Sequence, residues 1–335
     1  MQKFLVIQTA FIGDVVLATA LIEKLHSSYP DAHIDFLVRK GNETLLTDHP
    51  FLHEILVWNK RENKFRNLWR LIKKVRKTNY DAVINVQRFA ATGLLTAFSG
   101  ARQTIGFDKN PLSVFFSKKI PHIVGNLHEI DRNQTLIAAL TDDRPAKPRL
   151  YPSKADEEKV KPYKIDPYIT ISPASVWFTK QYPKEKWSAF LGQLPTGYTV
   201  YLLGAPSDRD LCEEIGAVYP KTRNLSGALS FLQSTALMKD AAMNYVNDSA
   251  PMHFASAVNA PVTAVYCSTI PGFGFGPLSD RRFIVEIREP LDCRPCGLHG
   301  YRKCPQGHFN CAWKIQESQL LATLKLGDPN LPHII

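Results

Sequence analysis

The feature that most constrains the fold is a repeated alternation of short apolar runs with helical patterns along most of the chain. Runs of this length, rich in Val, Ile, Leu and Phe, are typical of buried strands, and the helical patterns between them supply crossovers. We therefore predict the α/β class with doubly wound parallel sheets. Strands are predicted at residues 3–8, 34–38, 54–58, 81–85, 168–172, 199–203, 243–247 and 262–266, and helices at 14–27, 67–77, 90–99, 184–194, 207–218, 229–239 and 251–258.

The alternation is interrupted once, between residues 142 and 167. Residues 142–148 are polar and proline-rich, and residues 152–167 are charged with few apolar anchors, so we place an interdomain linker here. The length of 335 residues also suggests about two domains. We predict two Rossmann-like domains, residues 1–150 and residues 151–335, that face each other across a cleft.

The start of the chain resembles a signal peptide but is predicted to be the first strand of the fold. Gln8, Thr9 and Asp14 interrupt the apolar run early, and the helical pattern that follows is amphipathic. No run approaches the roughly 20 apolar residues of a spanning helix. We therefore expect a cytoplasmic protein whose six cysteines are reduced thiols or metal ligands, not a disulfide framework.

The formal net charge of +10 implies an anionic partner, which leaves open nucleic acid, a phosphorylated substrate or an anionic membrane face. Much of the excess lies in residues 60–77, where nine basic residues accompany a single acid, Glu62. Part of this charge is the solvated face of an amphipathic helix. Its density also suits docking of a phosphorylated substrate or a membrane surface. A nucleic-acid-binding protein is the main non-enzyme alternative, although no RNA-binding motif is present.

Gly13 and Asp14 lie between the first predicted strand and the helix that follows it. Open α/β sheets hold their chemistry at the carboxyl ends of strands. A carboxylate there can act as a general base if its oxygen reaches the substrate. The alternative is an acid that is favoured at a helix N-terminus by the dipole alone.

A second group of polar residues follows the first strand of the second half, in residues 172–183. The hydroxyls of Ser175 and Thr179 and the ammonium of Lys180 suit a phosphate, because they combine hydrogen-bond donors with a compact charge. The alternative is a surface loop with a solvated lysine.

A third group follows the strand at 243–247 and opens a helix with Pro251 near its first position. Free amides at Ser249 and Ala250 form a candidate anion site, and Asp248 could hold ribose hydroxyls. The alternative is a well-capped helix without a ligand. His253, one turn further on, suits either a ligand contact or a buried structural position.

Four cysteines near the C-terminus have the spacing C-x2-C-x7-C-x6-C and are accompanied by His299 and His308. Four soft ligands suit tetrahedral zinc, but one tight C-x2-C pair is a moderate signal. Small thiols packed in a compact loop are the alternative. The residues concerned are Cys293, Cys296, Cys304 and Cys311.

Together these segments resemble the family 9 glycosyltransferases, the ADP-heptose:lipopolysaccharide heptosyltransferases, over nearly the whole chain. The marks are residues 12–15, Thr179-Lys180-x-x-Pro183, residues 247–253 and the cysteine-bearing tail, which looks most like the heptosyltransferase II branch. The resemblance implies the GT-B type of fold, with the acceptor on the N-terminal domain and the donor on the C-terminal one. It also implies an inverting transfer that needs no metal and no cofactor.

The resemblance assigns roles residue by residue. It makes Asp14 the catalytic base and places Lys180 on the donor diphosphate beside Ser175 and Thr179. It places Asp248 near the ribose, with the amides of Ser249 and Ala250 around a phosphate and His253 close by. On the acceptor side it implies Gly13, Arg61, Lys64, Arg66, Gln87, Arg88, His128 and Arg132.

The expected partners are ADP-heptose and an inner-core lipopolysaccharide acceptor at the cytoplasmic membrane face, without nucleic acid. We expect a monomer with peripheral contact to the inner face of the inner membrane. A transferase of the same fold that uses another nucleotide sugar or acceptor is the alternative.

Overall fold

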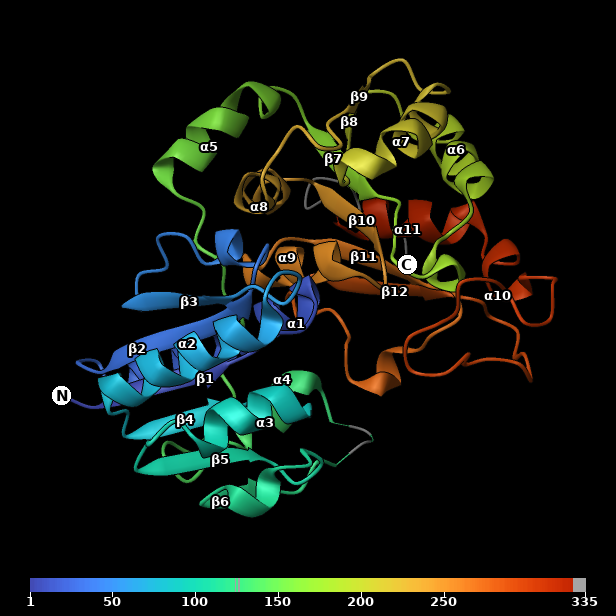
Figure 1. Ribbon diagram of the computed structural model, residues 1–335. Helices are drawn as coiled ribbons and strands as arrows, with labels where there is room; N and C mark the ends of the chain where they lie inside the picture. The colour runs from blue at the N-terminus through green and yellow to red at the C-terminus, as the bar shows by residue number, and fades with distance from the viewer. Residues whose placement is uncertain (124, 126, 328–335) are drawn as a thin grey trace. The chain divides into compact units, whose positions relative to one another are not determined.

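A computed structural model describes residues 1–123, 125 and 127–327 and divides the chain into two compact units (Figure 1). Unit 1 is Met1–Tyr151 and unit 2 is Pro152–Ile335. Each unit contains a six-stranded sheet, and every strand pair in both sheets is parallel. The predicted α/β class with two doubly wound parallel sheets is confirmed.

Unit 1 has the strand order β3-β2-β1-β4-β5-β6. Its inner strands are apolar because helices cover both faces of the sheet; for example, Leu5 and Ile7 pack with Trp58 and with Leu68 and Leu71 of α2. The elements are β1 (Lys3–Ile7), α1 (Ile12–Ser28), β2 (His33–Arg39), β3 (Glu54–Trp58), α2 (Lys64–Thr78), β4 (Ala82–Asn85), α3 (Ala90–Ala97), β5 (Gln103–Phe107), β6 (Lys118–Ile120) and α4 (Glu129–Gln134).

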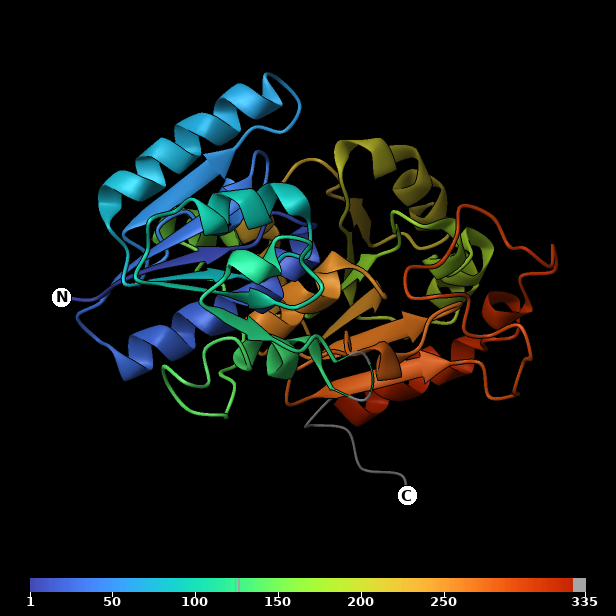
Figure 2. The ribbon, with the colours of Figure 1, turned by 60° about the horizontal axis from the view of Figure 1, so that its bottom comes forward.

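Unit 2 repeats this topology with the order β12-β11-β10-β7-β8-β9. Figure 2 shows its C-terminal strands and helices in orange and red. Its core joins Ile169, Ile171 and Tyr245 of the sheet to Trp187 and Phe190 of α6. The elements are α5 (Lys154–Val160), β7 (Tyr168–Ser172), α6 (Lys184–Gly192), β8 (Thr199–Leu202), α7 (Arg209–Gly216), β9 (Thr222–Asn224), α8 (Phe231–Lys239), β10 (Met243–Asn247), α9 (Ala250–Ala257), β11 (Val262–Tyr266), β12 (Arg282–Glu286), α10 (Asn310–Trp313) and α11 (Glu317–Gly327).

The strand order reverses direction once in each sheet, and this reversal positions the candidate site. In unit 1 the first strand lies between β2 and β4, and in unit 2 the first strand lies between β8 and β10. The loops after the two central strands of each sheet therefore leave in opposite directions, which opens a crevice at their carboxyl ends. We call these places the switch points of unit 1 (β1 and β4) and unit 2 (β7 and β10).

Several elements differ from the sequence-based prediction. The prediction missed β5, β6, β9 and β12, and it missed α4, α10 and α11. The predicted linker contains α5, whose N-terminus is closed by a capping box between Ser153 and Asp156. Among the described residues, no helix is both long and apolar enough to cross a bilayer.

Candidate active site

A buried asparagine organises the switch point of unit 2. Asn247, the last residue of β10, is fully buried. Its side-chain nitrogen donates to the carbonyl of Pro173 at 2.6 Å, and its side-chain oxygen accepts from the amide of Tyr182 at 3.0 Å. These bonds hold both ends of the loop after β7, so residues 173–182 have a fixed path past the end of β10.

The loop brings two of the predicted donor residues into direct contact. Lys180 Nζ lies 2.7 Å from Asp248 Oδ2, and their side chains are 14% and 9% exposed. The hydroxyl of Thr269 donates to the same carboxylate oxygen at 2.6 Å. A buried ion pair is stable when further hydrogen bonds satisfy its remaining groups. The arrangement places a cation and a carboxylate side by side at the switch point of unit 2.

Thr179 has a supporting position in the same loop. Its hydroxyl accepts from the amide of Tyr301 at 2.7 Å and lies 3.0 Å from the hydroxyl of Ser268. The side chain is buried, so it ties the Lys180 loop to the loop after β11 and to the cysteine-bearing segment. Ser175 is half-buried, and its carbonyl accepts from Gln181 at 2.6 Å. Direct contacts of Ser175 and Thr179 with a ligand stay predictions.

Helix α9 begins where the third group of polar residues, after the strand at 243–247, predicted a helix N-terminus. Ser249 is the N-cap residue in an extended conformation, and a proline occupies the first turn. Ser249 and Ala250 are half-buried and directly follow Asp248 in the chain. The free amides and dipole of a helix start favour an anion. His253 is 5% exposed, which favours its structural alternative over a ligand contact.

Side-chain amide groups hold the loops at the switch point of unit 1. The side chains of Gln8 and Gln87, which follow β1 and β4, hydrogen-bond to each other, and both are buried. Asn85 Oδ1 accepts from the amide of Gln87 at 2.9 Å. Gln87 thus shapes the loop, and the next residue, Arg88, is exposed.

Asp14 lies in the first turn of α1, which begins at Ile12 directly after the switch-point loop. Its neighbour Gly13 is half-buried, as Asp14 itself is. The short helix α4 packs against α1. His128 is the N-cap of α4 and accepts from the amide of Ile130 at 3.3 Å. The segment that contains His128 and Arg132 is therefore placed beside the helix that carries Asp14.

Arg132 and Glu129 form a buried ion pair in this segment, with side chains that are 6% and 12% exposed. Arg132 Nε also donates to the carbonyl of Ile123 at 2.9 Å. Burial raises the pKa of Glu129 to about 7 against the opposing charge of Arg132, and the carboxylate of Asp14 raises it further, while Arg88 lowers it. Glu129 therefore shares one electrostatic neighbourhood with Asp14 and Arg88, and the sequence analysis missed it. The signal available was its i,i+3 spacing from Arg132.

The basic segment begins at the same end of unit 1. Lys60 Nζ donates to the carbonyl and the hydroxyl of Thr9, both at 2.9 Å, and lies 4.8 Å from the ring centre of Trp58. Burial and then the charges of Arg39 and Lys64 lower the pKa of Lys60 to about 8. A cation is thereby fixed directly after β1.

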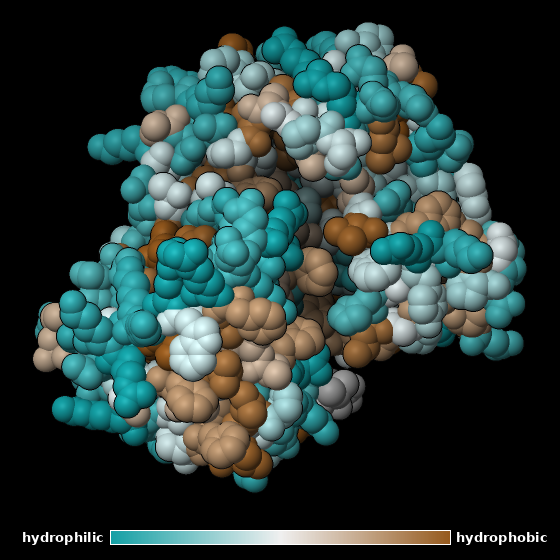
Figure 3. Space-filling view, in the orientation of Figure 1, coloured by the Kyte–Doolittle hydropathy of each residue, from teal (hydrophilic) through white to brown (hydrophobic). Residues whose placement is uncertain are grey.

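A pocket of about 590 Å³ lies beside Lys60 within unit 1. The predicted acceptor residues Arg61, Lys64 and Arg66 are exposed, and Lys64 lines the pocket. Large apolar side chains are exposed among them, including Phe65 and Phe89, and Figure 3 shows such apolar patches beside the hydrophilic surface of unit 1. The pocket lining includes Thr9, Trp58, Lys60, Lys64, Phe65 and Phe89.

The four cysteines are gathered in the segment before and within α10. Burial raises the pKa of Cys311 to about 12, and the thiols of Cys296, Cys304 and Cys293 contribute. Cys293 Sγ lies 4.0 Å from His308 Nε2. In the described part of the chain, one group of three side chains has possible metal-ligand atoms within 4.8 Å of one another, and none of the cysteines belongs to it. Zinc at the cysteines stays a prediction.

The model of glycosyltransferase family 9 (heptosyltransferase) matches residues 68–299 of the chain, which is more than half of it. The chain belongs to glycosyltransferase family 9. The matched range of this family 9 glycosyltransferase includes Arg88, Arg132, Lys180 and Asp248, and it begins after Asp14.

Individual proteins support the same family. The lipopolysaccharide heptosyltransferase 3 of Escherichia coli is 29% identical over 279 residues, which are 77% of this chain and 82% of that protein. The crystal structure of a family 9 glycosyl transferase from Veillonella parvula has a TM-score of 0.84 at 20% identity and covers 97% of both chains. The structure of E. coli ADP-heptose lps heptosyltransferase II has a TM-score of 0.80 at 22% identity, covering 97% of this chain and 98% of that one. These structures confirm that the family 9 glycosyltransferase has the GT-B type of fold.

Proposed function

We propose that this glycosyltransferase transfers a heptose from ADP-heptose to an inner-core lipopolysaccharide, with Asp14 as general base. The proposal rests on the kinds of residues that lie at the two switch points. In a chain of the heptosyltransferase family, a Lys180–Asp248 pair lies at one switch point and Asp14 follows the other. The curated relatives, which are named lipopolysaccharide and lipooligosaccharide heptosyltransferases, support this choice of substrates.

The donor side of the proposal uses unit 2. A nucleoside diphosphate needs cationic and N–H partners for its phosphates and an acceptor for its ribose hydroxyls. Lys180 and the amides of Ser249 and Ala250 supply the partners for the phosphates, and Asp248 supplies the acceptor for the ribose hydroxyls. As the bond to the sugar breaks, negative charge grows on the leaving ADP, so these donors stabilise the transition state more than the ground state. We propose that this charge stabilisation makes a metal ion unnecessary, and transfer in the presence of EDTA tests that point.

The acceptor side uses unit 1. Asp14 takes the proton from the attacking hydroxyl, which is expected to contribute about 10²–10⁴-fold to the rate. Attack by that hydroxyl on the anomeric carbon, opposite the leaving diphosphate, inverts the configuration. The developing positive charge on the sugar resembles that of glycoside hydrolysis. Lys60, Lys64, Arg61 and Arg66 suit the phosphate and carboxylate groups of an inner-core acceptor.

We further propose that unit 1 meets its acceptor at the cytoplasmic face of the inner membrane. Exposed Phe65 and Trp69 lie among the basic residues of α2. Aromatic side chains and cations at one surface suit the interface of an anionic membrane. The same residues account for the net charge without nucleic acid.

Calorimetric titration of ADP, UDP, GDP and NAD into the whole protein, with EDTA present, tests the donor assignment. We expect ADP to bind, Lys180→Ala to weaken that binding, and Lys184→Ala to leave it unchanged. Lys184, four residues after Lys180, is a suitable control because it is exposed and pairs with Glu214 on the surface. Preference for UDP or GDP would retain the transferase and discard the heptose donor. Absence of nucleotide binding would refute the assignment of unit 2.

A further inference from the structure

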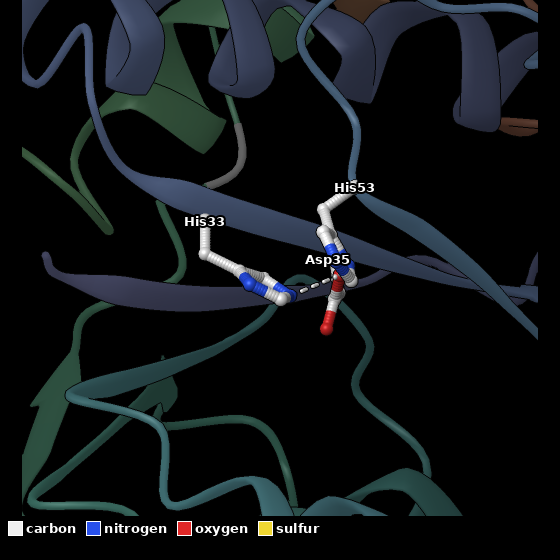
Figure 4. A group of neighbouring side chains, drawn as sticks. All are labelled: His33, Asp35 and His53. Atoms are coloured by element: carbon white, nitrogen blue, oxygen red, sulfur yellow. Dashed lines mark hydrogen bonds and ion pairs between the residues drawn. The ribbon is translucent and has the colours of Figure 1, made fainter.

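Three metal-ligating side chains meet at the amino end of the sheet of unit 1, the end opposite to the switch point (Figure 4). His33 and Asp35 are two residues apart in β2, so they point to the same face of the sheet. His53 immediately precedes β3, and its amide donates to the carbonyl of Ile34 at 2.8 Å. This backbone bond fixes His53 beside the other two residues. The proposed transfer reaction uses none of them.

The ligand atoms converge on one carboxylate oxygen. His33 Nε2 lies 3.0 Å from Asp35 Oδ1, and His53 Nδ1 lies 3.4 Å from the same oxygen. One ligand atom from each residue lies within 4.8 Å of the others. With metal–ligand bonds of about 2.0–2.1 Å, neighbouring ligands of a tetrahedral ion are about 3.3 Å apart. These separations are close to those of a coordination shell; because the rings of His33 and His53 stack with their centres 3.5 Å apart, one imidazole must turn to direct its nitrogen at the ion.

The electrostatics of the cluster also favour a cation. The side chain of Asp35 is 1% exposed, and in the described part of the chain its ion-pair partners are the two histidines. A buried carboxylate is costly unless its charge is compensated. The hydroxyl of Tyr80 donates to Asp35 Oδ2, which leaves Oδ1 directed at the histidines. The side chain of His53 is 62% exposed, which gives an ion a path from solvent.

We propose that His33, Asp35 and His53 bind a divalent transition-metal ion of the zinc class. Two imidazoles and one carboxylate suit Zn²⁺ or Co²⁺, whereas Mg²⁺ and Ca²⁺ prefer oxygen ligands. Water completes the coordination on the solvent side. Tyr80 orients the carboxylate through its second oxygen, in the manner of an outer-shell hydrogen bond. The bound ion would tie β2 to the edge strand β3, which is followed by the basic segment at residues 60–77.

The test is binding of Co²⁺ and Zn²⁺ to the whole, chelator-treated protein, compared with His53→Ala. Because His53 is largely exposed, this variant removes a ligand without opening the core. His26→Ala is the matched control, since His26 is a half-buried histidine of unit 1 that stacks on Phe51 outside the cluster. All variants keep the four cysteines, so any metal that these bind is common to every sample.

We expect the wild type and His26→Ala to bind one more Co²⁺ per chain than His53→Ala. We expect Zn²⁺ to raise the unfolding temperature of the first two proteins by more than that of His53→Ala. Tyr80→Phe is expected to weaken the binding by about 10-fold, because it removes the orienting hydrogen bond. His33→Gln provides a second, independent loss of one ligand. Equal stoichiometry in the wild type, His53→Ala and His33→Gln would show that the cluster is an ion pair only and would overturn the proposal.

Discussion

Replacing Glu129 by glutamine is expected to remove a pH dependence from the stability of unit 1. The side chain is 12% exposed, and burial raises its pKa to about 7 from an ordinary value of 4.5. Arg132 opposes this shift and the charge of Asp14 adds to it. The effect of burial on the pKa of Glu129 is thus larger than the effect of the ion pair with Arg132.

The sign follows from proton linkage. Between pH 4.5 and 7 the folded protein keeps a proton on Glu129 that the unfolded chain has released. The stabilising contribution is complete below the unfolded pKa and is lost as the pH rises through the folded pKa. With these two pKa values, about 2 kcal/mol of the free energy of unfolding is lost between about pH 5.5 and pH 8. Glutamine carries no titrating proton, so Glu129→Gln lacks this loss.

Hydrogen exchange at the central amides of β1 and β4 measures this free energy, because these amides exchange through unfolding of unit 1. Comparing wild type and Glu129→Gln at each pH cancels the intrinsic pH dependence of exchange. Glu62→Gln, which alters an exposed glutamate of the same unit, is expected to behave as the wild type. If the ion pair with Arg132 outweighs burial, the sign reverses and Glu129→Gln destabilises unit 1 most at pH 8. That result would refute the reasoning.

Three further predictions concern the reaction. Asp14→Asn should lower kcat by about 10²–10⁴-fold and leave the ADP affinity measured by calorimetry unchanged; normal turnover would remove Asp14 from the role of base. Lys180→Ala should weaken ADP binding and destabilise unit 2 by about 3 kcal/mol, because it leaves Asp248 buried without its cation. Adding Asp248→Asn should restore the stability in thermal unfolding but not the binding. The pKa of Lys60 is about 8, so the KM for the acceptor should rise above that pH as Lys60 loses its charge. Lys60→Arg should keep this KM constant to pH 9. An identical rise in the variant would contradict the role of Lys60 in acceptor binding.

The sequence predicts most inner strands and misses three of the four edge strands, for a physical reason; the exceptions are the inner strand β5, which was missed, and the edge strand β3, which was predicted. Strands such as β7 and β11 are buried on both faces, so their apolar runs stand out in the sequence. The edge strands β6 and β9 contain Lys118, Lys119 and Arg223, whose polarity suits an exposed edge and hides the strand. The helix α4 spans six residues, too few for its periodicity to be visible.

The site residues, too, were predictable only where the strand order alone places them. Lys180 and Asp248 were predictable as neighbours because they follow the first and fourth strands of one doubly wound sheet, and these strands adjoin at its switch point. The raised pKa of Glu129 was not predictable, because it arises from burial between α4 and α1, which no local pattern reports. The cluster of His33, Asp35 and His53 likewise depends on the register of β2 against β3.

The two units share a strand order but hold their switch-point acids in different ways, and this difference supports the roles that we propose for Asp248 and Asp14. Asp248 is nearly buried, and one of its oxygens already accepts from Lys180 and Thr269, so it suits anchoring a ligand. Asp14 is half-buried in a first helical turn, and this partial exposure suits the general base that we propose. A second carboxylate beside a base would repel the charge that the base must carry. Burial raises the pKa of Glu129 to about 7, so below that pH this glutamate places less negative charge beside Asp14 than an ordinary glutamate would.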